Sequence, residues 1–242
     1  MAFLSTFWCD YLSPIYQGLW QGLWPLHCIL CGLKGENGRD LCSACYQELP
    51  WLKNACLRCA RPLSLPSLIC GFCLKKPPLY QQTLALWHYQ PPLAQLLVAL
   101  KFQGKLIYGH ILGELLAEVV AQRYPTGLPE LIIPVPLHPQ RLKERGYNQA
   151  LELAKPLKKL GIKIAPRVCL RIKATEPQMK LPAKLRKTNL KNAFALAAPI
   201  TAQHVAIVDD VVTTGHTVAE LCKVLRKAGV QRIDVWCCAR SG

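Results

Sequence analysis

Acidic residues are scarce in this chain of 242 residues, which carries 14 Asp and Glu against 30 Lys and Arg and a formal net charge of +16. Hydrophobic residues make up 51% and charged residues 18% of the sequence, a balance that excludes a disordered or collagen-like protein. No apolar run reaches the roughly 18 residues that a transmembrane helix requires. The cationic excess favours an anionic partner such as nucleic acid, a phosphate ester or a membrane surface.

The opening segment, residues 1–27, lacks the features of a secretory signal. No basic region follows Met1, and Asp10 and Pro14 interrupt the apolar stretch. Its aromatic and aliphatic residues recur every four positions, which predicts an aromatic-rich helix kinked near Pro14. Such a helix either packs on the protein's own core or lies against a membrane or a partner. We therefore expect a cytoplasmic protein, with peripheral contact to the inner membrane through residues 1–27 as an open alternative.

Eight of the thirteen cysteines form four CxxC pairs whose starts are 14 residues apart: Cys28/Cys31, Cys42/Cys45, Cys56/Cys59 and Cys70/Cys73. Two such pairs supply the four thiolates of a tetrahedral site, so the array predicts two structural zinc ions in a double zinc ribbon over residues 28–76. Disulfides and iron are the alternatives. Sequential pairing is favoured over interleaved pairing, although the spacing does not prove it. We expect the other cysteines to be packing residues: Cys9, Cys169, Cys222, Cys237 and Cys238.

The chain changes character after residue 76. Apolar spacing predicts helices over residues 93–102, 110–123, 148–160 and 217–228, and short apolar runs predict strands over 131–135, 205–209 and 233–238. This alternation predicts an α/β domain with a parallel sheet, which we assign to residues 84–242. Ligands of such sheets bind beyond the carboxyl ends of the strands.

One strand end carries two acids followed by small and hydroxylated residues. Free backbone N–H groups at the start of a helix bind phosphate, and adjacent carboxylates accept hydrogen bonds from a diol. The stretch therefore predicts a site for a sugar phosphate, formed by Asp209, Asp210, Val211, Val212, Thr213, Thr214, Gly215, His216 and Thr217.

The run VAIVDDVVTTGHT at residues 205–217 resembles the signature with which type I phosphoribosyltransferases bind 5-phosphoribosyl-1-pyrophosphate (PRPP). Together with the CxxC array, LKFQG at residues 100–104 and PVPLHP at 134–139, it makes the chain similar to the ComF family of competence proteins. The resemblance covers roughly residues 28–240. It implies a small Cys-rich double zinc ribbon followed by a parallel-sheet, type I phosphoribosyltransferase-like α/β domain.

Fifteen Lys or Arg and only three Glu lie between residues 137 and 192. The resemblance implies that residues 137–148 form a loop for pyrophosphate and Mg²⁺, with contributions from Pro136, Arg141, Arg145, Gly146, Asn148 and, on another element, Lys101. It also implies a hood before the PRPP signature, with nucleic-acid contacts from Arg171, Lys173, Thr175, Gln178, Lys184, Arg186 and Lys187. The surplus charge suits single-stranded DNA, the ligand implied for the family. Aromatic residues that could stack on bases, or belong to the core, are Phe102, Tyr147 and Phe194.

Two functions fit these patterns. The first is a cytoplasmic DNA-uptake or competence protein that binds single-stranded DNA and carries a pocket for PRPP and Mg²⁺, with a DNA-translocation helicase or another competence protein as a further partner. The second is an active phosphoribosyltransferase of nucleotide metabolism that uses PRPP and an unidentified acceptor. A binding site is not a reaction, so no catalytic residue is assigned. The cysteine array and the cationic surplus favour the first function.

Overall fold

The computed structural model describes residues 25–64, 68–174 and 192–241. The chain divides into two compact units, Met1–Leu49 and Pro50–Gly242. The described part of the first unit consists of tight turns and the helix α2 (Ser43–Glu48). Cys42 caps this helix, because its Sγ accepts a hydrogen bond from the Cys45 amide at 3.5 Å. The helix expected within residues 1–27 lies almost wholly outside the described residues, as does Cys9.

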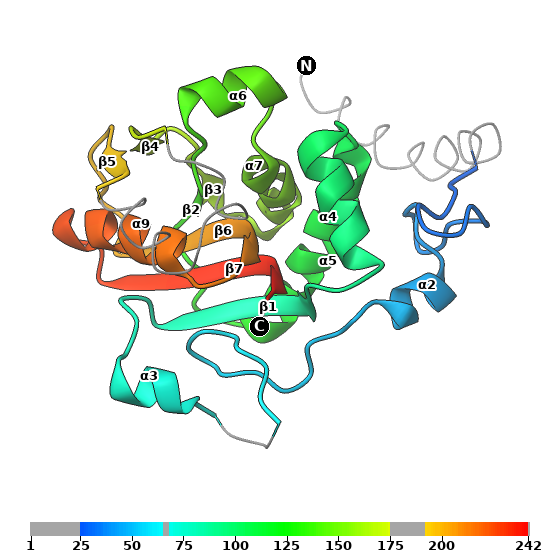
Figure 1. Ribbon diagram of the computed structural model, residues 1–242, viewed down its shortest axis with the longest axis horizontal. Coiled ribbons are helices and arrows are strands. Elements are labelled where there is room, and N and C mark those ends of the chain that lie inside the picture. The colour runs from blue at the N-terminus through cyan, green and yellow to red at the C-terminus, as the bar shows by residue number, and fades with distance from the viewer. Residues whose placement is uncertain (1–24, 65–67, 175–191, 242) are drawn as a thin grey trace, which may run out of the picture. The chain divides into compact units, whose positions relative to one another are not determined.

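The second unit is built on a five-stranded sheet of order β1-β7-β6-β2-β3 (Figure 1). Its strands are β1 (Gln82–His88), β2 (Leu131–Pro134), β3 (Lys163–Ile164), β6 (His204–Val212) and β7 (Arg232–Arg240). Every neighbouring pair is parallel. A separate antiparallel hairpin joins β4 (Cys169–Arg171) to β5 (Phe194–Leu196). The predicted class is confirmed: an α/β fold with a parallel sheet, preceded in the sequence by a Cys-rich segment.

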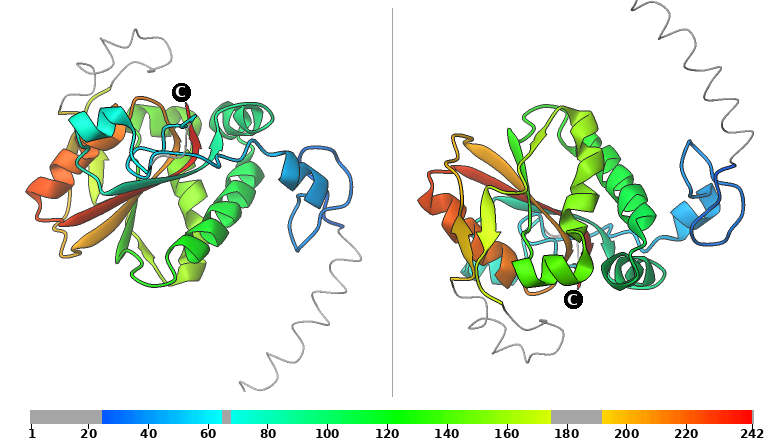
Figure 2. Two further views of the ribbon diagram at one scale, coloured as in Figure 1. Left: turned by 90° about the horizontal axis from the view of Figure 1, so that it is seen from below. Right: turned by 90° about the horizontal axis from the view of Figure 1, so that it is seen from above.

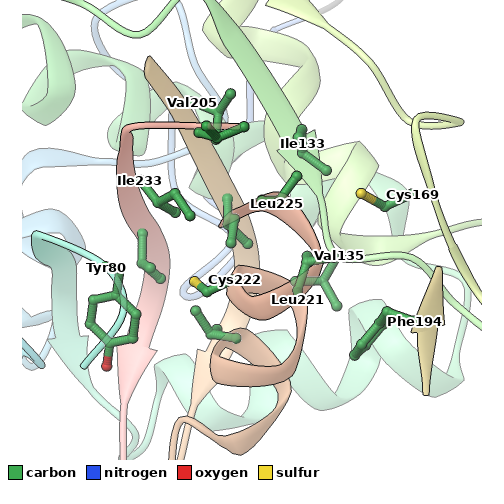
Figure 3. Packing of buried hydrophobic residues seen from close by; sticks show 14 of the residues in the cluster. Tyr80, Ile133, Val135, Cys169, Phe194, Val205, Leu221, Cys222, Leu225 and Ile233 are labelled. Atoms are coloured by element: carbon green, nitrogen blue, oxygen red, sulfur yellow. The ribbon is translucent and has the colours of Figure 1, made fainter. Parts of the chain in front are cut away.

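Helices cover both faces of this sheet. Figure 2 shows α9 (His216–Lys227) on one face and α5 (Leu106–Arg123), with α7 (Gln149–Ala154) beside it, on the other. Leu221 and Leu225 of α9 pack towards Ile133, Val205 and Ile233 of the strands (Figure 3). The other described helices of this unit are α3 (Gly71–Lys75), α4 (Leu93–Phe102), α6 (Pro139–Arg145) and the 3₁₀ helix η1 (Lys155–Leu160). Among the described helices, none is both long enough and apolar enough to cross a bilayer.

The observed elements differ from the predicted ones at particular residues. The predicted helix over 148–160 is α-helical only to Ala154 and continues as 3₁₀, because Pro156 has no N–H for an α-helical hydrogen bond. The strand predicted over 205–209 extends to Val212, so both acids of the signature belong to β6. The strands β1 and β3 and the β4–β5 hairpin were not predicted from the sequence. The cysteines predicted to be packing residues are buried where they are described: Cys169, Cys222, Cys237 and Cys238.

Candidate functional site

The eight CxxC cysteines form two clusters, one from Cys28, Cys31, Cys42 and Cys45 and the other from Cys56, Cys59, Cys70 and Cys73. Within each cluster the Sγ atoms lie within 4.8 Å of one another, and the Cys31–Cys42 and Cys59–Cys70 sulfurs are 3.7 Å apart. Tetrahedral zinc with Zn–S bonds of about 2.3 Å places its sulfurs about 3.8 Å apart. The donors therefore fit two zinc sites with sequential pairing. Four thiolates leave no coordination position for a substrate, so the sites are structural.

The acid pair lies in the carboxyl-terminal half of β6. Asp209 and Asp210 are 8% and 3% exposed. The Asp210 amide donates to Asp209 Oδ1 at 2.9 Å, and Gln149 Nε2 donates to Asp210 Oδ1 at 3.3 Å. Lys101, at the end of α4, forms an ion pair with Asp210 Oδ2. Residues from three separate elements therefore meet at these two carboxylates.

The pKa values of the two carboxyl groups are shifted in opposite directions. Burial, reinforced by the neighbouring Asp210, raises the pKa of Asp209 well above its usual value. Burial by itself would raise the pKa of Asp210 too, but the Lys101 ammonium outweighs it and holds that pKa below the usual value. The pair thus consists of one carboxyl group that favours its proton and one carboxylate neutralised by lysine. Such a pair repels an anionic ligand far less than two free carboxylates would.

The chain turns sharply after β6. Residues 213–215 form the turn, in which Gly215 has a φ of 76°, a left-handed conformation that suits glycine. Thr214 Oγ1 lies 3.1 Å from His216 Nδ1, and His216 and Thr217 begin α9. The nine predicted residues are therefore divided among a strand, a turn and a helix. Val212 points into the hydrophobic core and is a packing residue.

The segment expected to form the pyrophosphate loop is mostly helix α6. His138 Nδ1 accepts a hydrogen bond from the Gln140 amide at 3.3 Å, and Gly146, with a φ of 82°, ends the helix. Asn148 caps α7 through the Ala150 amide and donates to the Val135 carbonyl, both at 3.0 Å. Pro136 is buried. Asn148 and Pro136 thus shape the connection, whereas Arg141 and Arg145 lie on α6.

A cavity of about 230 Å³ lies between the end of α4 and α6 and is lined by Lys101, Phe102, Gly104, Arg141, Glu144, Arg145 and Tyr147. The Arg145 guanidinium lies 5.6 Å from the ring centroid of Phe102, whose side chain is 64% exposed. Arg145 also donates to Gln149 Oε1, and Gln149 in turn contacts Asp210. A continuous chain of polar contacts therefore joins the cavity to the acid pair.

The hood residues are only partly described. Arg171, on β4, stacks its guanidinium 5.8 Å from the ring centroid of Phe194, which is buried. Burial lowers the pKa of Arg171, while nearby Asp209 acts to raise it. Lys173 is exposed. The other predicted hood residues lie outside the described residues: Thr175, Gln178, Lys184, Arg186 and Lys187.

Two residues at the site were assigned no role from the sequence. Gln149 stands directly after the cap residue of α7, and Arg240 ends a buried strand, where it contacts the backbone of Val212 and Thr213. The signal for Gln149 was its place in a polar run at the carboxyl side of β2. For Arg240 the signal was a charged residue at the end of an otherwise apolar strand.

Residues 19–74 match the double zinc ribbon domain family. The DNA utilization protein YhgH of Salmonella typhimurium (strain LT2) is 42% identical over 205 residues, which cover 83% of this chain and 90% of the relative. Competence protein F of Haemophilus influenzae is 40% identical over 213 residues, 85% of this chain and 92% of the relative. The chain belongs to the family of YhgH and competence protein F. YhgH of Escherichia coli K12, in the same family, is 40% identical over 219 residues, 88% of this chain and 96% of its own.

Two solved structures align with about half of the chain. One is a glutamine PRPP amidotransferase from B. subtilis, which aligns with a TM-score of 0.34 and 16% identity over 54% of this chain and 26% of that chain. The other is a purine phosphoribosyltransferase from Pyrococcus horikoshii, which aligns with a TM-score of 0.30 and 21% identity over 53% of this chain and 70% of that chain.

Proposed function

We propose that this member of the YhgH and competence protein F family acts in the cytoplasm, where it binds PRPP with Mg²⁺ around Asp209 and Asp210 and single-stranded DNA on the adjoining cationic surface. One observation is the main support for the proposal. Lys101 forms an ion pair with Asp210 in the PRPP signature, and the ring of the next residue, Phe102, lies under the Arg145 guanidinium in the cationic cavity. Two consecutive residues of α4 thus join the two ligand sites. The names of the relatives, DNA utilization and competence, support a role in handling DNA.

Each part of PRPP has a chemically matched group at the site. The carboxyl groups of Asp209 and Asp210 suit the ribose diol and supply the oxygen ligands that Mg²⁺ prefers. The backbone amides of the turn after β6 suit the 5′-phosphate. Arg141 and Arg145 carry the positive charge that a pyrophosphate group needs. We expect Lys101 to neutralise Asp210 in the free protein and to turn towards the pyrophosphate when the diol occupies that carboxylate.

The cavity beside Phe102 has the chemistry of a single-strand binding site. Unpaired bases stack on exposed aromatic rings and guanidinium planes, and Lys and Arg side chains neutralise the phosphates. Phe102 and Arg145 form the stacking pair, and Lys101 and Arg141 lie around it. The basic residues between 137 and 192 extend the cationic character, and we propose that a DNA-translocation helicase or another competence protein delivers the strand.

The test is a pair of titrations on the full-length, zinc-loaded protein. Calorimetry measures the affinity for PRPP with Mg²⁺, and anisotropy of a labelled oligo-dT measures DNA binding at several salt concentrations. Replacing both acids, by Asp209→Asn with Asp210→Asn, should abolish PRPP binding and leave DNA binding. Phe102→Ala should weaken DNA binding about 5- to 100-fold, as expected for the loss of base stacking, and leave PRPP binding.

Phe72→Ala is the matched control, because Phe72 is also exposed and has Arg61 5.6 Å from its ring centroid, but lies on α3. Equal losses for Phe72→Ala and Phe102→Ala would refute the cavity as the DNA site. Unchanged PRPP affinity in the double Asp variant would refute the PRPP pocket. Release of pyrophosphate from PRPP in the presence of a nucleobase or amine would support the second function, a working phosphoribosyltransferase.

A further inference from the structure

Arg240, the last residue of β7, places a guanidinium in the interior, and none of the carboxylates among the described residues pairs with it. It is 4% exposed, and the hydrogen bonds of its guanidinium within the described chain go to backbone carbonyls. Nε donates to the Cys59 carbonyl at 2.9 Å, and Nη1 donates to the Val212 carbonyl at 3.0 Å. Nη1 also contacts the carbonyls of Thr213 and Ser241. Because burial of a charge is costly, this set of backbone acceptors for Nε and Nη1 points to a specific task.

The acceptors belong to two different sites. Cys59 is a ligand of the second cysteine cluster. Val212 ends β6, and Thr213 begins the turn of the PRPP signature. One guanidinium therefore joins the backbone of a zinc ligand to the backbone that enters the phosphate-binding turn.

The contact also fixes the direction of the amides in that turn. A trans peptide group is planar, and its C=O and N–H point in opposite directions. Arg240 holds the carbonyls of Val212 and Thr213, so the amides of Thr213 and Thr214 in the same peptide groups are directed away from the guanidinium. Those amides are among the phosphate donors of the proposed PRPP site.

The other end of the contact is fixed independently of Arg240. The Thr83 amide donates to the Leu57 carbonyl at 3.1 Å, and Thr83 Oγ1 donates to the Arg58 carbonyl at 2.8 Å. The Cys56 Sγ accepts a hydrogen bond from the Cys70 amide at 3.3 Å. With zinc bound, the turn that contains Cys59 is thus held both by the metal and by β1.

We infer that Arg240 is a positioning residue through which the second zinc centre orients the phosphate-binding turn after β6. The inference rests on the proposed PRPP site, and it assigns to the second zinc a part in ligand affinity that the first zinc does not have. Loss of the second zinc, or of Arg240, releases the same peptide groups and weakens binding of PRPP.

The test uses three variants. The first carries Arg240→Gln, the second loses the second zinc through the paired changes Cys70→Ser and Cys73→Ser, and the third combines all three substitutions. Zinc per chain, calorimetric affinity for PRPP with Mg²⁺, and amide hydrogen exchange of the peptide spanning residues 211–217 are measured for each. Arg240→Gln should retain two zinc ions, bind PRPP about tenfold more weakly and exchange faster in that peptide. The combined variant should bind PRPP no more weakly than the weaker binder of the other two variants, because both changes interrupt the same connection.

Two controls separate this connection from general destabilisation. Arg232→Gln alters an arginine at the other end of β7, where its guanidinium contacts Asp234, and should leave PRPP affinity unchanged. Cys28→Ser with Cys31→Ser removes the first zinc and should also leave it unchanged. Arg240→Lys, which retains the charge, should restore part of the affinity.

The inference is overturned if Arg240→Gln matches the wild type both in PRPP affinity and in hydrogen exchange of residues 211–217. It is also overturned if the fold-losses of PRPP affinity from Arg240→Gln and from zinc removal multiply in the combined variant. A wild-type protein that fails to bind PRPP would refute the proposed function instead. Hydrogen exchange would still decide the connection in that case, because it requires no ligand.

Discussion

The two cysteine clusters repeat one local geometry in two different settings. In the first, the Cys28 amide donates to the Leu33 carbonyl at 2.7 Å, and in the second the Cys56 amide donates to the Arg61 carbonyl at 2.9 Å. The first belongs to the unit Met1–Leu49, and its Cys31 is exposed. The second belongs to the unit that contains the parallel sheet, and its cysteines are buried with Leu63 and Ile69 packed against them.

This difference shows that the same metal motif can have two structural roles. The first cluster is held by contacts within its own unit, such as the bond from the His27 amide to Asp40 Oδ1 at 2.9 Å. The second is connected to β1 through Thr83 and to β7 through Arg240. We therefore expect zinc to stabilise a local turn in the first cluster and part of the sheet in the second.

Removing each zinc in turn should give the largest contrast. Cys70→Ser with Cys73→Ser and Cys28→Ser with Cys31→Ser should each leave one zinc per chain, measured by a colorimetric chelator. The second-cluster variant should lower the Tm of the sheet-containing unit by on the order of 10 °C, because several kcal/mol of metal-dependent stability are lost at about 2–4 °C per kcal/mol. Thermal unfolding followed by circular dichroism measures it. Equal decreases in Tm for the two variants would contradict the expected difference between the two clusters.

Breaking one contact between the second cluster and the sheet should have a moderate effect. Thr83→Val retains the shape of the buried side chain but leaves the Arg58 carbonyl without its hydroxyl donor. We expect a loss of about 1–2 kcal/mol, a decrease in Tm of a few degrees, and two zinc ions still bound. The exposed Thr201 in the same unit provides the control, Thr201→Val. No decrease relative to that control would mean that the Thr83 hydroxyl does not stabilise the sheet.

The sequence predicted the features that depend on neighbouring residues. The CxxC spacing predicted both metal sites, and the apolar run before Asp209 predicted the strand that ends at the signature. The helix α6 was also predictable in principle, because Pro139 at its first position and Gly146 after its last are standard boundary signals.

The contacts that define the site could not be predicted, because they join residues far apart in the chain. Lys101 meets Asp210, and Arg240 meets Cys59, only because β1 and β7 pair in parallel and α4 ends near the carboxyl end of β6. The sequence of β1 contains Gln82 and Thr83 and has no clear alternation of apolar and polar residues. Its place in the sheet depends on a partner strand about 150 residues away, and local periodicity contains no information about that partner.

Changing the residue after the first CxxC pair of each cluster should give the smallest contrast between the two zinc sites. Gly32 and Ala60 occupy equivalent positions with φ values of 74° and 53°, a region that favours glycine. Gly32→Ala should weaken the first zinc site by about 1 kcal/mol, since a Cβ there meets no atom within 4 Å and only the backbone is strained. Ala60→Gly relieves that strain but loses a methyl group that is 1% exposed, worth about 0.8 kcal/mol, so the second site should change little. Competition with a chelator measures both affinities. A larger loss for Ala60→Gly than for Gly32→Ala would show that packing, and not backbone conformation, determines the strength of both sites.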